Sequence, residues 1–407
     1  MNKKKILNDP VYGFITIYND LIFDIIEHPY FQRLRRIKQL GLTDLVYPGA
    51  HHTRFHHAIG AMHLMQKTLD NLRGKGVMIF EAEYEAALIA ILLHDIGHGP
   101  FSHTLEFSLF KDVKHEQISL WLFDKLNDEF QGKLTLAKQV FTGVYQRKFL
   151  HQLVSSQLDV DRLDYLKRDS FFTGVHEGTI GSERIIKMLN VHDDRLVVEE
   201  KGIYSIENFL NARRLMYWQV YLHKTAVAAE SMLVSLIKRA KMLTQTAQPV
   251  PSTPALAIFL EQEISANDFF EDQDLLEVFV QLDDTDIWGS IKQWVSHEDL
   301  ILRSLSNDLL SRRLFKIILS NEEIDQALIS EIEAKLVTQG IKEADLPFLI
   351  QKGAISNSAY VVKDESIDIL MKNGEIVDVA KASDLPNITV MSRIVKKNYI
   401  SFPKNSY

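Results

Sequence analysis

The pattern of hydrophobic positions is mainly helical. Residues 84–94, "YEAALIAILLH", are apolar nearly all round, which predicts a helix buried in the core. The segment "HEQISLWLFDKLNDEF" at 115–130 is amphipathic, and so is a long stretch from Ile206 to about Leu243. Helical patterns continue to about residue 345, and "TAQPVPSTP" at 246–254 predicts a loop or linker between them.

The character of the chain changes after these helices. The segment "SIDILMKNGEIVDVA" alternates between apolar and polar residues around Asn373-Gly374, a dipeptide typical of tight hairpin turns. We therefore predict a mainly α fold, with a helical core over residues 1–245 and a smaller mixed α/β lobe over 246–407.

Composition and charge narrow the class of protein. The chain has 407 residues, 46% hydrophobic and 25% charged, and no apolar run of membrane-spanning length or signal-peptide character. We therefore expect a cytoplasmic protein with no membrane partner. The absence of cysteine excludes disulfides, thiolate metal sites and cysteine nucleophiles.

The net charge of -8 argues against a general nucleic-acid binder, although a local basic pocket is compatible with it. Charge is unevenly distributed, because "RLRRIK" at 33–38 is basic and residues 261–286 are strongly acidic. Any site for a polyanion should therefore lie in the first half of the chain.

Histidines are concentrated in one segment. Nine of the fifteen lie between residues 51 and 115, namely His51, His52, His56, His57, His63, His94, His98, His103 and His115. A single histidine is usually a surface residue or a satisfied core residue, but nine in one segment indicate a shared pocket. Asp95 and Glu106 lie within the same segment.

In the stretch "AILLHDIGHGPFSHTLE" at 90–106, an apolar run is followed directly by the polar pair His94 and Asp95. Burying an unpaired imidazole or carboxylate is costly, so a metal, a hydrogen-bond network or a helix end must compensate. His94 and His98 share one side if the helix continues through Gly97, and Asp95 joins them at a helix end. Mixed imidazole and carboxylate ligands suit Mn, Fe, Ni or Zn better than Ca.

A further acid for such a site lies in "SSQLDVDRLDYLKRD" at 155–169. Asp161, Tyr165 and Asp169 follow each other at intervals of four, which places them on one stripe of a helix.

The other acids of this segment fit a solvated helix face better. Asp159 and Asp164 can pair there with Arg162 or Arg168, and we expect no ligand role for them.

A second stripe consists of Arg213, Tyr217, Tyr221 and Lys224. Arginine and lysine suit phosphate oxygens, and the aromatic rings could stack on a base or line a sugar pocket. A helix face that packs against another element explains the same spacing equally well.

Four motifs together resemble a known superfamily. "YPGAHHTRFHHAIG", "LLHDIGHGPFSHTLE", "KHEQ" and "QLDVDRLDYLKRD" occur in this order. They resemble the HD-domain phosphohydrolases, and more narrowly the deoxynucleoside triphosphate triphosphohydrolases related to the mammalian SAM- and HD-domain protein. The resemblance covers roughly residues 5 to 240 and implies an HD-domain helical core.

The resemblance also implies roles for individual residues. Metal ligands fall on His57, His94, Asp95 and Asp161, where His57 and not His56 matches the pattern Arg-Phe-any-His. Acid–base residues fall on His98, His103 and His115, with Glu106 as the supporting acid. We favour His103 as the acid that protonates the leaving oxygen, with His98 and His115 as neighbours or substitutes. Phosphate contacts fall on Arg54, Arg162, Tyr165 and Arg213. Positions around the deoxyribose fall on Gln39, Leu40, Asp169 and Tyr221.

Three departures from the mammalian pattern concern the substrate and its regulation. Arg162 replaces a lysine, and Tyr217 replaces a histidine beside the sugar. Glu27, Gln32 and Arg35 match a guanine-nucleotide activator site in which glutamate replaces aspartate.

The implied activity is metal-dependent hydrolysis of deoxynucleoside triphosphates to a deoxynucleoside and tripolyphosphate. The expected cofactor is a divalent ion (Mn, Fe or Mg, with Zn or Ni also suitable), and the expected assembly is a homodimer or homotetramer. The alternatives are another HD-type nucleotide phosphohydrolase or phosphodiesterase, or a non-catalytic binder of nucleotides or single-stranded nucleic acid. The last alternative would retain the basic positions while losing metal ligands.

Overall fold

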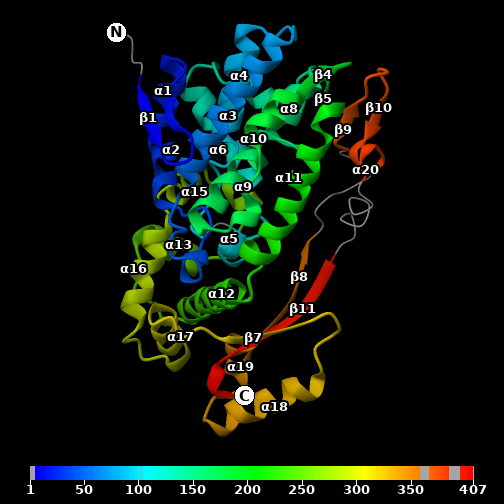
Figure 1. Cartoon of the computed structure of the whole chain (residues 1–407). Coiled ribbons are helices and arrows are strands. Elements are labelled where there is room, and N and C mark those ends of the chain that lie inside the picture. The colour runs from blue at the N-terminus through cyan, green and yellow to red at the C-terminus, as the bar shows by residue number, and fades with distance from the viewer. Residues whose placement is uncertain (1–4, 102, 358–365, 385–394, 407) are drawn as a thin grey trace.

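The protein is mostly helical, as predicted (Figure 1). The computed structural model describes residues 5–101, 103–357, 366–384 and 395–406. The helices of the N-terminal body are α1 (Asp20–Glu27), α2 (Pro29–Gln32), α3 (Arg54–Gly74), α4 (Glu81–Leu93), α5 (His103–Leu109), α6 (His115–Glu129), α7 (Thr135–Phe141), α8 (Lys148–Val154), α9 (Val160–Thr173), α10 (Ser182–Met188), α11 (Ile203–Met216) and α12 (Lys224–Gln245). The later helices are α13 (Pro254–Glu261), α14 (Ala266–Glu271), α15 (Gln273–Phe279), α16 (Asp284–Trp294), α17 (Leu300–Leu310), α18 (Gln326–Thr338), α19 (Leu346–Leu349) and α20 (Val379–Ala382).

Helix α4 is the central buried helix that the apolar pattern predicts. It packs against α3 and α7, and its residues from Ala86 to Leu93 are all buried. The helix ends at Leu93, so the condition under which His94 and His98 would share one side of a helix, its continuation through Gly97, is not met. Gly97 instead approaches α6 so closely that a Cβ there would lie 2.3 Å from the carbonyl oxygen of His115. His94 and Asp95 consequently lie just beyond the C-terminal end of α4 and not along one side of the helix.

The long helix expected from Ile206 to about Leu243 is broken. Helix α11 passes into a π-helical turn, Tyr217–Tyr221, and α12 then starts at Lys224 with its axis turned by 53°. The break occurs at His223, whose backbone is extended and whose side chain accepts a hydrogen bond from the Thr225 N–H at the start of α12. Lys224 therefore leaves the stripe that the spacing predicted.

The small sheets use strands from distant parts of the chain. The strands are β1 (Ile6–Asp9), β2 (Gly13–Thr16), β3 (Phe110–Lys111), β4 (Leu189–His192), β5 (Arg195–Glu199), β6 (Ile264–Ser265), β7 (Lys316–Ser320), β8 (Gln351–Asn357), β9 (Asp368–Leu370), β10 (Ile376–Asp378) and β11 (Val395–Phe402). They form two pairs, β1-β2 and β3-β6, and two larger sheets in the orders β10-β9-β5-β4 and β7-β11-β8. Strand β7 corrects the expectation of uninterrupted helix to residue 345, because pairing with β11 fixes this segment as extended.

The predicted hairpin at Asn373-Gly374 is confirmed. Strands β9 and β10 are antiparallel, and Gly374 has the positive φ of +85° that the turn requires. The hairpin does not stand alone, because β9 pairs in parallel with β5 of the N-terminal body. Figure 1 shows β9, β10 and α20 beside β4 and β5, away from the sheet that contains β8 and β11.

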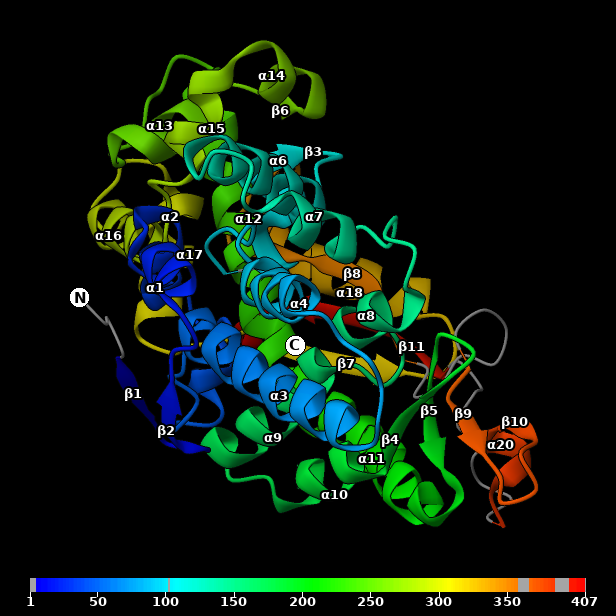
Figure 2. The ribbon, with the colours of Figure 1, turned by 90° about the horizontal axis from the view of Figure 1, so that it is seen from above.

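The segment 246–254 is the predicted connection, between the end of α12 and the start of α13. The helices that follow pack back on the body, since α12 contacts both α13 and α17. Figure 2 shows α13, α14 and α15 beside α6 and β3, and the β3-β6 pair joins the two regions directly. A domain boundary after residue 245 stays a prediction, and these contacts cross it.

No single helix in the described part of the chain has both the length and the apolar composition of a membrane span, although the bent pair Glu200–Tyr221 and Lys224–Gln245 meets those criteria together.

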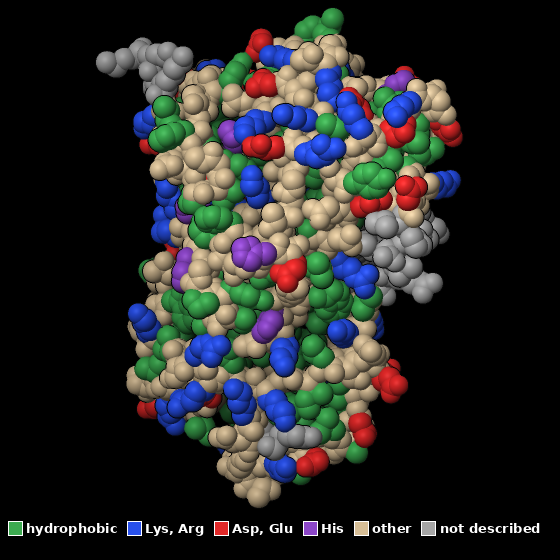
Figure 3. Space-filling model, viewed as in Figure 1, with side chains coloured by type: hydrophobic (Ala, Val, Ile, Leu, Met, Phe, Trp, Pro, Cys, Tyr) green, Lys and Arg blue, Asp and Glu red, His purple; other side chains and the backbone are tan. Residues whose placement is uncertain are grey.

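The surface carries charges of both signs. Figure 3 shows lysine and arginine side chains over the helical body and over the C-terminal sheet, so a net charge of -8 leaves basic regions exposed.

Candidate metal centre and substrate hollow

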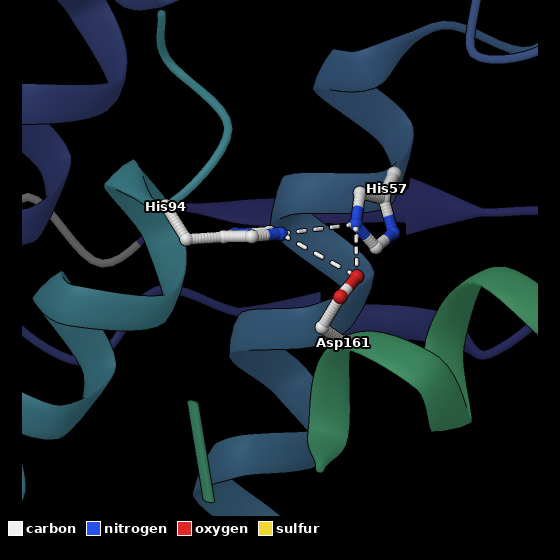
Figure 4. Close-up of side chains that lie close together, drawn as sticks. All are labelled: His57, His94 and Asp161. Carbon is white, nitrogen blue, oxygen red and sulfur yellow. Dashed lines mark hydrogen bonds and ion pairs between the residues drawn. The ribbon is translucent and has the colours of Figure 1, made fainter. Parts of the chain in front are cut away.

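Three elements bring metal-ligating side chains to one point. His57 lies in the first turn of α3, His94 directly follows α4, and Asp161 lies in the first turn of α9. Figure 4 shows the three side chains directed at one another. His57 Nε2 lies 3.3 Å from His94 Nε2 and 3.0 Å from Asp161 Oδ1, and His94 Nε2 lies 3.5 Å from Asp161 Oδ1.

Asp95 completes the predicted set of four. Its Oδ1 lies 3.4 Å from His94 Nε2, and its Oδ2 lies 3.8 Å from His57 Nε2. The Arg54 guanidinium donates a hydrogen bond to the same carboxylate. The structure thus brings all four sequence-predicted ligands together, from three segments spread over residues 57 to 161.

The other nitrogen of each histidine is already engaged. His57 Nδ1 lies 2.8 Å from Asp164 Oδ2, and His94 Nδ1 lies 2.6 Å from the carbonyl oxygen of Ile91. Because both acceptors require a proton on Nδ1, each Nε2 keeps a lone pair directed at the centre. His56 is different, since its Nδ1 accepts from the Thr53 N–H at the start of α3.

Asp164 therefore supports a metal ligand, and the solvated face expected for it from the sequence is wrong. It is fully buried, and Arg168, also fully buried, donates from Nε and Nη2 at 2.9 and 3.0 Å. The predicted pairing of these two residues is confirmed, but its environment is the core. Gly60 of α3 makes room for the pair, because a Cβ there would lie 2.1 Å from both side chains. The interval of three between Asp161 and Asp164 was the available signal.

Asp159 also departs from the solvated face that we expected. It is buried, its side chain caps α9 by accepting from the Arg162 N–H, and it pairs with the Arg162 guanidinium at 3.3 Å.

The donor set fits one divalent ion. Adjacent ligands bound at about 2.1 Å lie about 3.0 to 3.4 Å apart, close to the spacings of the three nearest donors. Two lone pairs facing each other across 3.3 Å repel unless a cation or a proton lies between them. Two imidazoles and two carboxylates suit Mn, Fe or Zn, and they leave positions free for water and substrate.

The pKa values of His57 and Asp161 also indicate that the centre stabilises a bound positive charge. Burial lowers the pKa of His57, but hydrogen bonds with Asp161 and Asp164 outweigh burial and raise it to about 10. Burial raises the pKa of Asp161, yet the two imidazoles lower it well below its usual range. A bound cation would replace the proton that these carboxylates otherwise draw onto His57.

The predicted acid–base residues line one side of the centre. His98 Nε2 lies 3.4 Å from Asp95 Oδ1, and the His98 ring stacks on His115 with centroids 3.8 Å apart. Glu106 holds His115 by accepting from its backbone N–H at 2.6 Å and from Nδ1 at 2.9 Å. Burial and the nearby Arg54 lower the pKa of His98 well below its usual value, so this imidazole is neutral. The side chain of His103 lies outside the described residues.

The loop that carries Asp95 and His98 is held from behind by Arg33. This buried guanidinium donates to the carbonyl oxygens of Ile96 at 2.9 Å and His98 at 2.8 Å, and burial lowers its pKa to about 9. The basic run at 33–38 is thus partly structural, since Arg36 pairs with Asp283. The sequence gives no sign of this support, because arginine in a basic run suggests a site for a polyanion.

A hollow of about 660 Å³ opens beside the centre. Predicted substrate residues that line it are Arg54, Arg162, Tyr165, Gln39, Leu40, Asp169, Tyr217 and Tyr221. Residues that sequence analysis missed also line it, namely Gly41, Thr43, Phe101, Thr104, Glu116, Leu222 and Glu230. Arg213 does not line it, and its Nη1 donates to Gln157 Oε1 at 3.2 Å.

One wall of the hollow is a fixed network. The Tyr221 hydroxyl donates to Asp169 Oδ2 at 2.7 Å, and His52 Nε2 lies 2.7 Å from Asp169 Oδ1. The ring of Tyr221 lies edge-on to those of Tyr165 and Tyr217. Two other lining groups are unsatisfied among the described residues, because Gln39 Oε1 and Arg162 Nε are buried without hydrogen-bond partners. Such atoms indicate a bound ligand or water.

The predicted activator residues lie near one another at the surface, and none of them lines the hollow. Arg35 Nε donates to Gln32 Oε1 at 2.8 Å, its guanidinium stacks 3.5 Å from the Phe55 ring, and Glu27 interacts with it electrostatically. Lys5 lies 3.9 Å from Glu27. The site remains a prediction.

Comparison with known proteins agrees with this geometry. The HD domain family matches residues 54–169, and the HD associated region matches residues 180–249. The Bacillus subtilis protein YwfO, itself uncharacterized, is 31% identical over 94% of this chain and 88% of its own length. A Dictyostelium discoideum deoxynucleoside triphosphate triphosphohydrolase, a SAMHD1 homolog, is 30% identical over 88% of this chain and 69% of its own.

A solved structure extends the similarity to the whole fold. A phosphohydrolase from Bacteroides thetaiotaomicron superposes with a TM-score of 0.95 at 52% identity, covering 98% of this chain and 100% of that one. The matched HD region contains His57, His94, Asp95 and Asp161, which are the four converging ligands. This chain therefore belongs to the HD-domain phosphohydrolases.

Proposed function

We propose that this protein is a metal-dependent deoxynucleoside triphosphate triphosphohydrolase. The observation that carries the proposal is the hollow itself, which is lined by two arginines beside the ligand carboxylates and by the aromatic ring of Tyr221. The Arg54 guanidinium donates to Asp95, and Arg162 Nη1 lies 3.7 Å from Asp161 Oδ2. Its volume of about 660 Å³ suits a nucleotide-sized ligand. The name of the Dictyostelium relative supports the same substrate class.

His57, His94, Asp95 and Asp161 would hold a divalent ion, which would supply a water of lowered pKa and polarise a phosphoryl oxygen. The reaction adds water across the bond between the α-phosphorus and O5′, giving a deoxynucleoside and tripolyphosphate. Arg54 and Arg162 bind the triphosphate oxygens and stabilise the charge that develops on them.

The leaving O5′ atom needs a proton. The imidazole of His115 is oriented by Glu106, which accepts from Nδ1 and leaves Nε2 for the substrate. His98 is held neutral and stacked against it, and it positions His115 and Asp95. The side chain of His103, the acid that we favour from the sequence, lies outside the described residues, and His115 is the described histidine whose geometry suits this role.

The deoxyribose would lie against Tyr221 and Leu40. Because Asp169 fixes the Tyr221 hydroxyl, the ring is not free to swing away from a 2′-hydroxyl. Exclusion of ribonucleotides is therefore steric.

We further propose cytoplasmic location, assembly into a dimer or tetramer, and activation by a guanine nucleotide near Glu27, Gln32 and Arg35. These proposals rest on the family resemblance.

The test is product analysis. The purified protein is incubated with each of the four deoxynucleoside triphosphates and Mn, Fe or Mg, with and without GTP or dGTP, and the products are separated by anion-exchange chromatography. Tripolyphosphate and deoxynucleoside in equal amounts support the proposal. Release of monophosphate or diphosphate would show another nucleotide phosphohydrolase, and hydrolysis of cyclic nucleotides alone would show a phosphodiesterase.

A further inference from the structure

One carboxyl group in the hollow has no part in the chemistry described above. Glu230 lies in α12, where its neighbours Ala226–Ala229 and Ser231–Leu233 are all buried. Glu230 itself is half-buried and lines the hollow together with Leu222 and Phe101. An otherwise buried stretch of helix thus presents a single acidic side chain to the substrate space.

The other acids of this hollow that point toward the centre have partners. Asp95 accepts from Arg54, Asp161 lies against His57, and Asp169 accepts from Tyr221. For Glu230, no hydrogen bond or charged partner occurs among the described residues, and burial raises its pKa to about 7. A carboxyl that is desolvated without a partner destabilises the folded protein, which indicates a ligand that supplies the partner.

A purely structural role does not explain this position. Favourable interaction of an acid with the helix dipole is confined to the first turn, and Glu230 is six residues beyond Lys224, where α12 begins. A solubilising role would require a side chain directed to bulk water and not to a hollow.

Charge decides which part of a nucleotide faces Glu230. A carboxylate repels the triphosphate, which Arg54 and Arg162 attract, so Glu230 suits the neutral part that carries hydrogen-bond donors. Nucleobases offer such donors, and guanine offers two adjacent N–H groups that one carboxylate accepts together. We propose that Glu230 is a specificity-determining residue that accepts hydrogen bonds from the nucleobase and favours guanine. This inference rests on the proposed function and adds the group that selects the base.

The experiment compares wild type, Glu230→Gln and Glu230→Ala with the control Glu261→Gln, which makes the same change on an exposed side chain of α13. Values of kcat/KM are measured for the four deoxynucleoside triphosphates, and thermal unfolding checks that each variant folds. We expect wild type to prefer dGTP over TTP. Glu230→Gln should lower this ratio by about tenfold or more, because the site loses an acceptor that the guanine edge requires. Glu261→Gln should leave the ratio unchanged. An unchanged ratio in Glu230→Gln, or an equal loss for all four substrates, overturns the inference.

Binding of the four deoxynucleosides, measured by calorimetry on the same variants, separates this inference from the proposed function. If wild type hydrolyses no deoxynucleoside triphosphate, the proposed function fails, and the nucleoside affinities still test Glu230. Tighter binding of deoxyguanosine than thymidine, lost in Glu230→Gln, supports base selection. Equal affinities in wild type overturn it.

Discussion

The metal centre and the rest of the hollow differ in whether their polar groups have partners within the protein. At the metal end, every nitrogen and carboxylate that we describe has a neighbour within 4 Å, and Asp164, Arg168 and Arg33 hold the ligands from behind. Among the other residues that line the hollow, Gln39 Oε1, Arg162 Nε and the Glu230 carboxyl lack partners within the described part of the chain. The metal ligands are therefore held by the protein itself, whereas we expect these lining groups to find their partners on the substrate. Changes at the metal end should therefore affect turnover for all substrates, and changes at the other end should affect the choice among them.

The largest effect should follow from removal of a ligand. His94→Ala and Asp95→Ala should each lower kcat by about 1000-fold or more, because several kcal/mol of transition-state stabilisation depends on the ion. Bound metal, measured by mass spectrometry after gel filtration, should fall with activity. A metal-free His94→Ala/Asp95→Ala double variant that still hydrolyses substrate would show that the centre lies elsewhere.

A smaller effect should follow from loss of the support behind His57. Asp164→Asn keeps the size of the side chain but removes the charge that accepts from His57 Nδ1, and it should lower metal affinity or activity about 10-fold to 100-fold. Arg168 also loses one of its two buried carboxylate partners and keeps Asp9, so thermal unfolding must be measured in parallel. The control is Asp124→Asn, an exposed acid paired with Lys138. Full metal affinity in a folded Asp164→Asn protein would contradict this division of roles.

At the opposite end, a change should alter selectivity more than rate. Tyr221→Ala opens space beside the sugar and should raise ribonucleotide turnover relative to deoxyribonucleotide turnover by about tenfold. Tyr221→Phe keeps the ring but removes the hydrogen bond to Asp169, so its ratio should change less. The measurement is kcat/KM for dGTP and GTP, and an unchanged ratio in Tyr221→Ala would remove Tyr221 from the sugar site.

The last prediction concerns stability, with the smallest effect expected on turnover. Asp284 accepts hydrogen bonds from the Lys38 and Phe101 N–H groups. Burial raises its pKa from 3.8 to about 6, so between these pH values the folded protein holds a proton that the unfolded chain has lost. The contribution of Asp284 to the unfolding free energy therefore decreases as pH rises from about 4 to 6, by at most about 3 kcal/mol. Asp284→Asn should become more stable relative to wild type over this range, as measured by urea unfolding. A constant difference between the two proteins would contradict the raised pKa.

Sequence patterns predicted those parts of the molecule that depend on local periodicity. The buried helix α4, the amphipathic α6 and the hairpin around Gly374 each have a repeat or turn signal within a few residues. The break at His223 left no such signal, because a π-helical turn preserves the apolar spacing on both sides of it. The strand β7 depends on pairing with β11, about eighty residues later, which local preference does not encode.

The site shows the same distinction. His57, His94, Asp95 and Asp161 were found through motif resemblance, and spacing alone placed Asp161, Tyr165 and Asp169 on one stripe that lines the hollow. Asp164 was missed because burial, and not spacing, separates a supporting carboxylate from a surface ion pair. Glu230 was missed because its environment comes from α12 packing beside segments more than a hundred residues earlier in the chain.

The parallel pairing of β9 with β5 bears on how this protein can be divided for study. A fragment ending at residue 245 would uncover one edge of β5, whose unpaired amide and carbonyl groups would be free to join strands of other molecules. The same cut would remove Leu282 and Asp284, which anchor Arg33 and the loop before α5. Such a fragment should self-associate and lose the shape of its metal loop, so the catalytic half is best prepared with its C-terminal half attached.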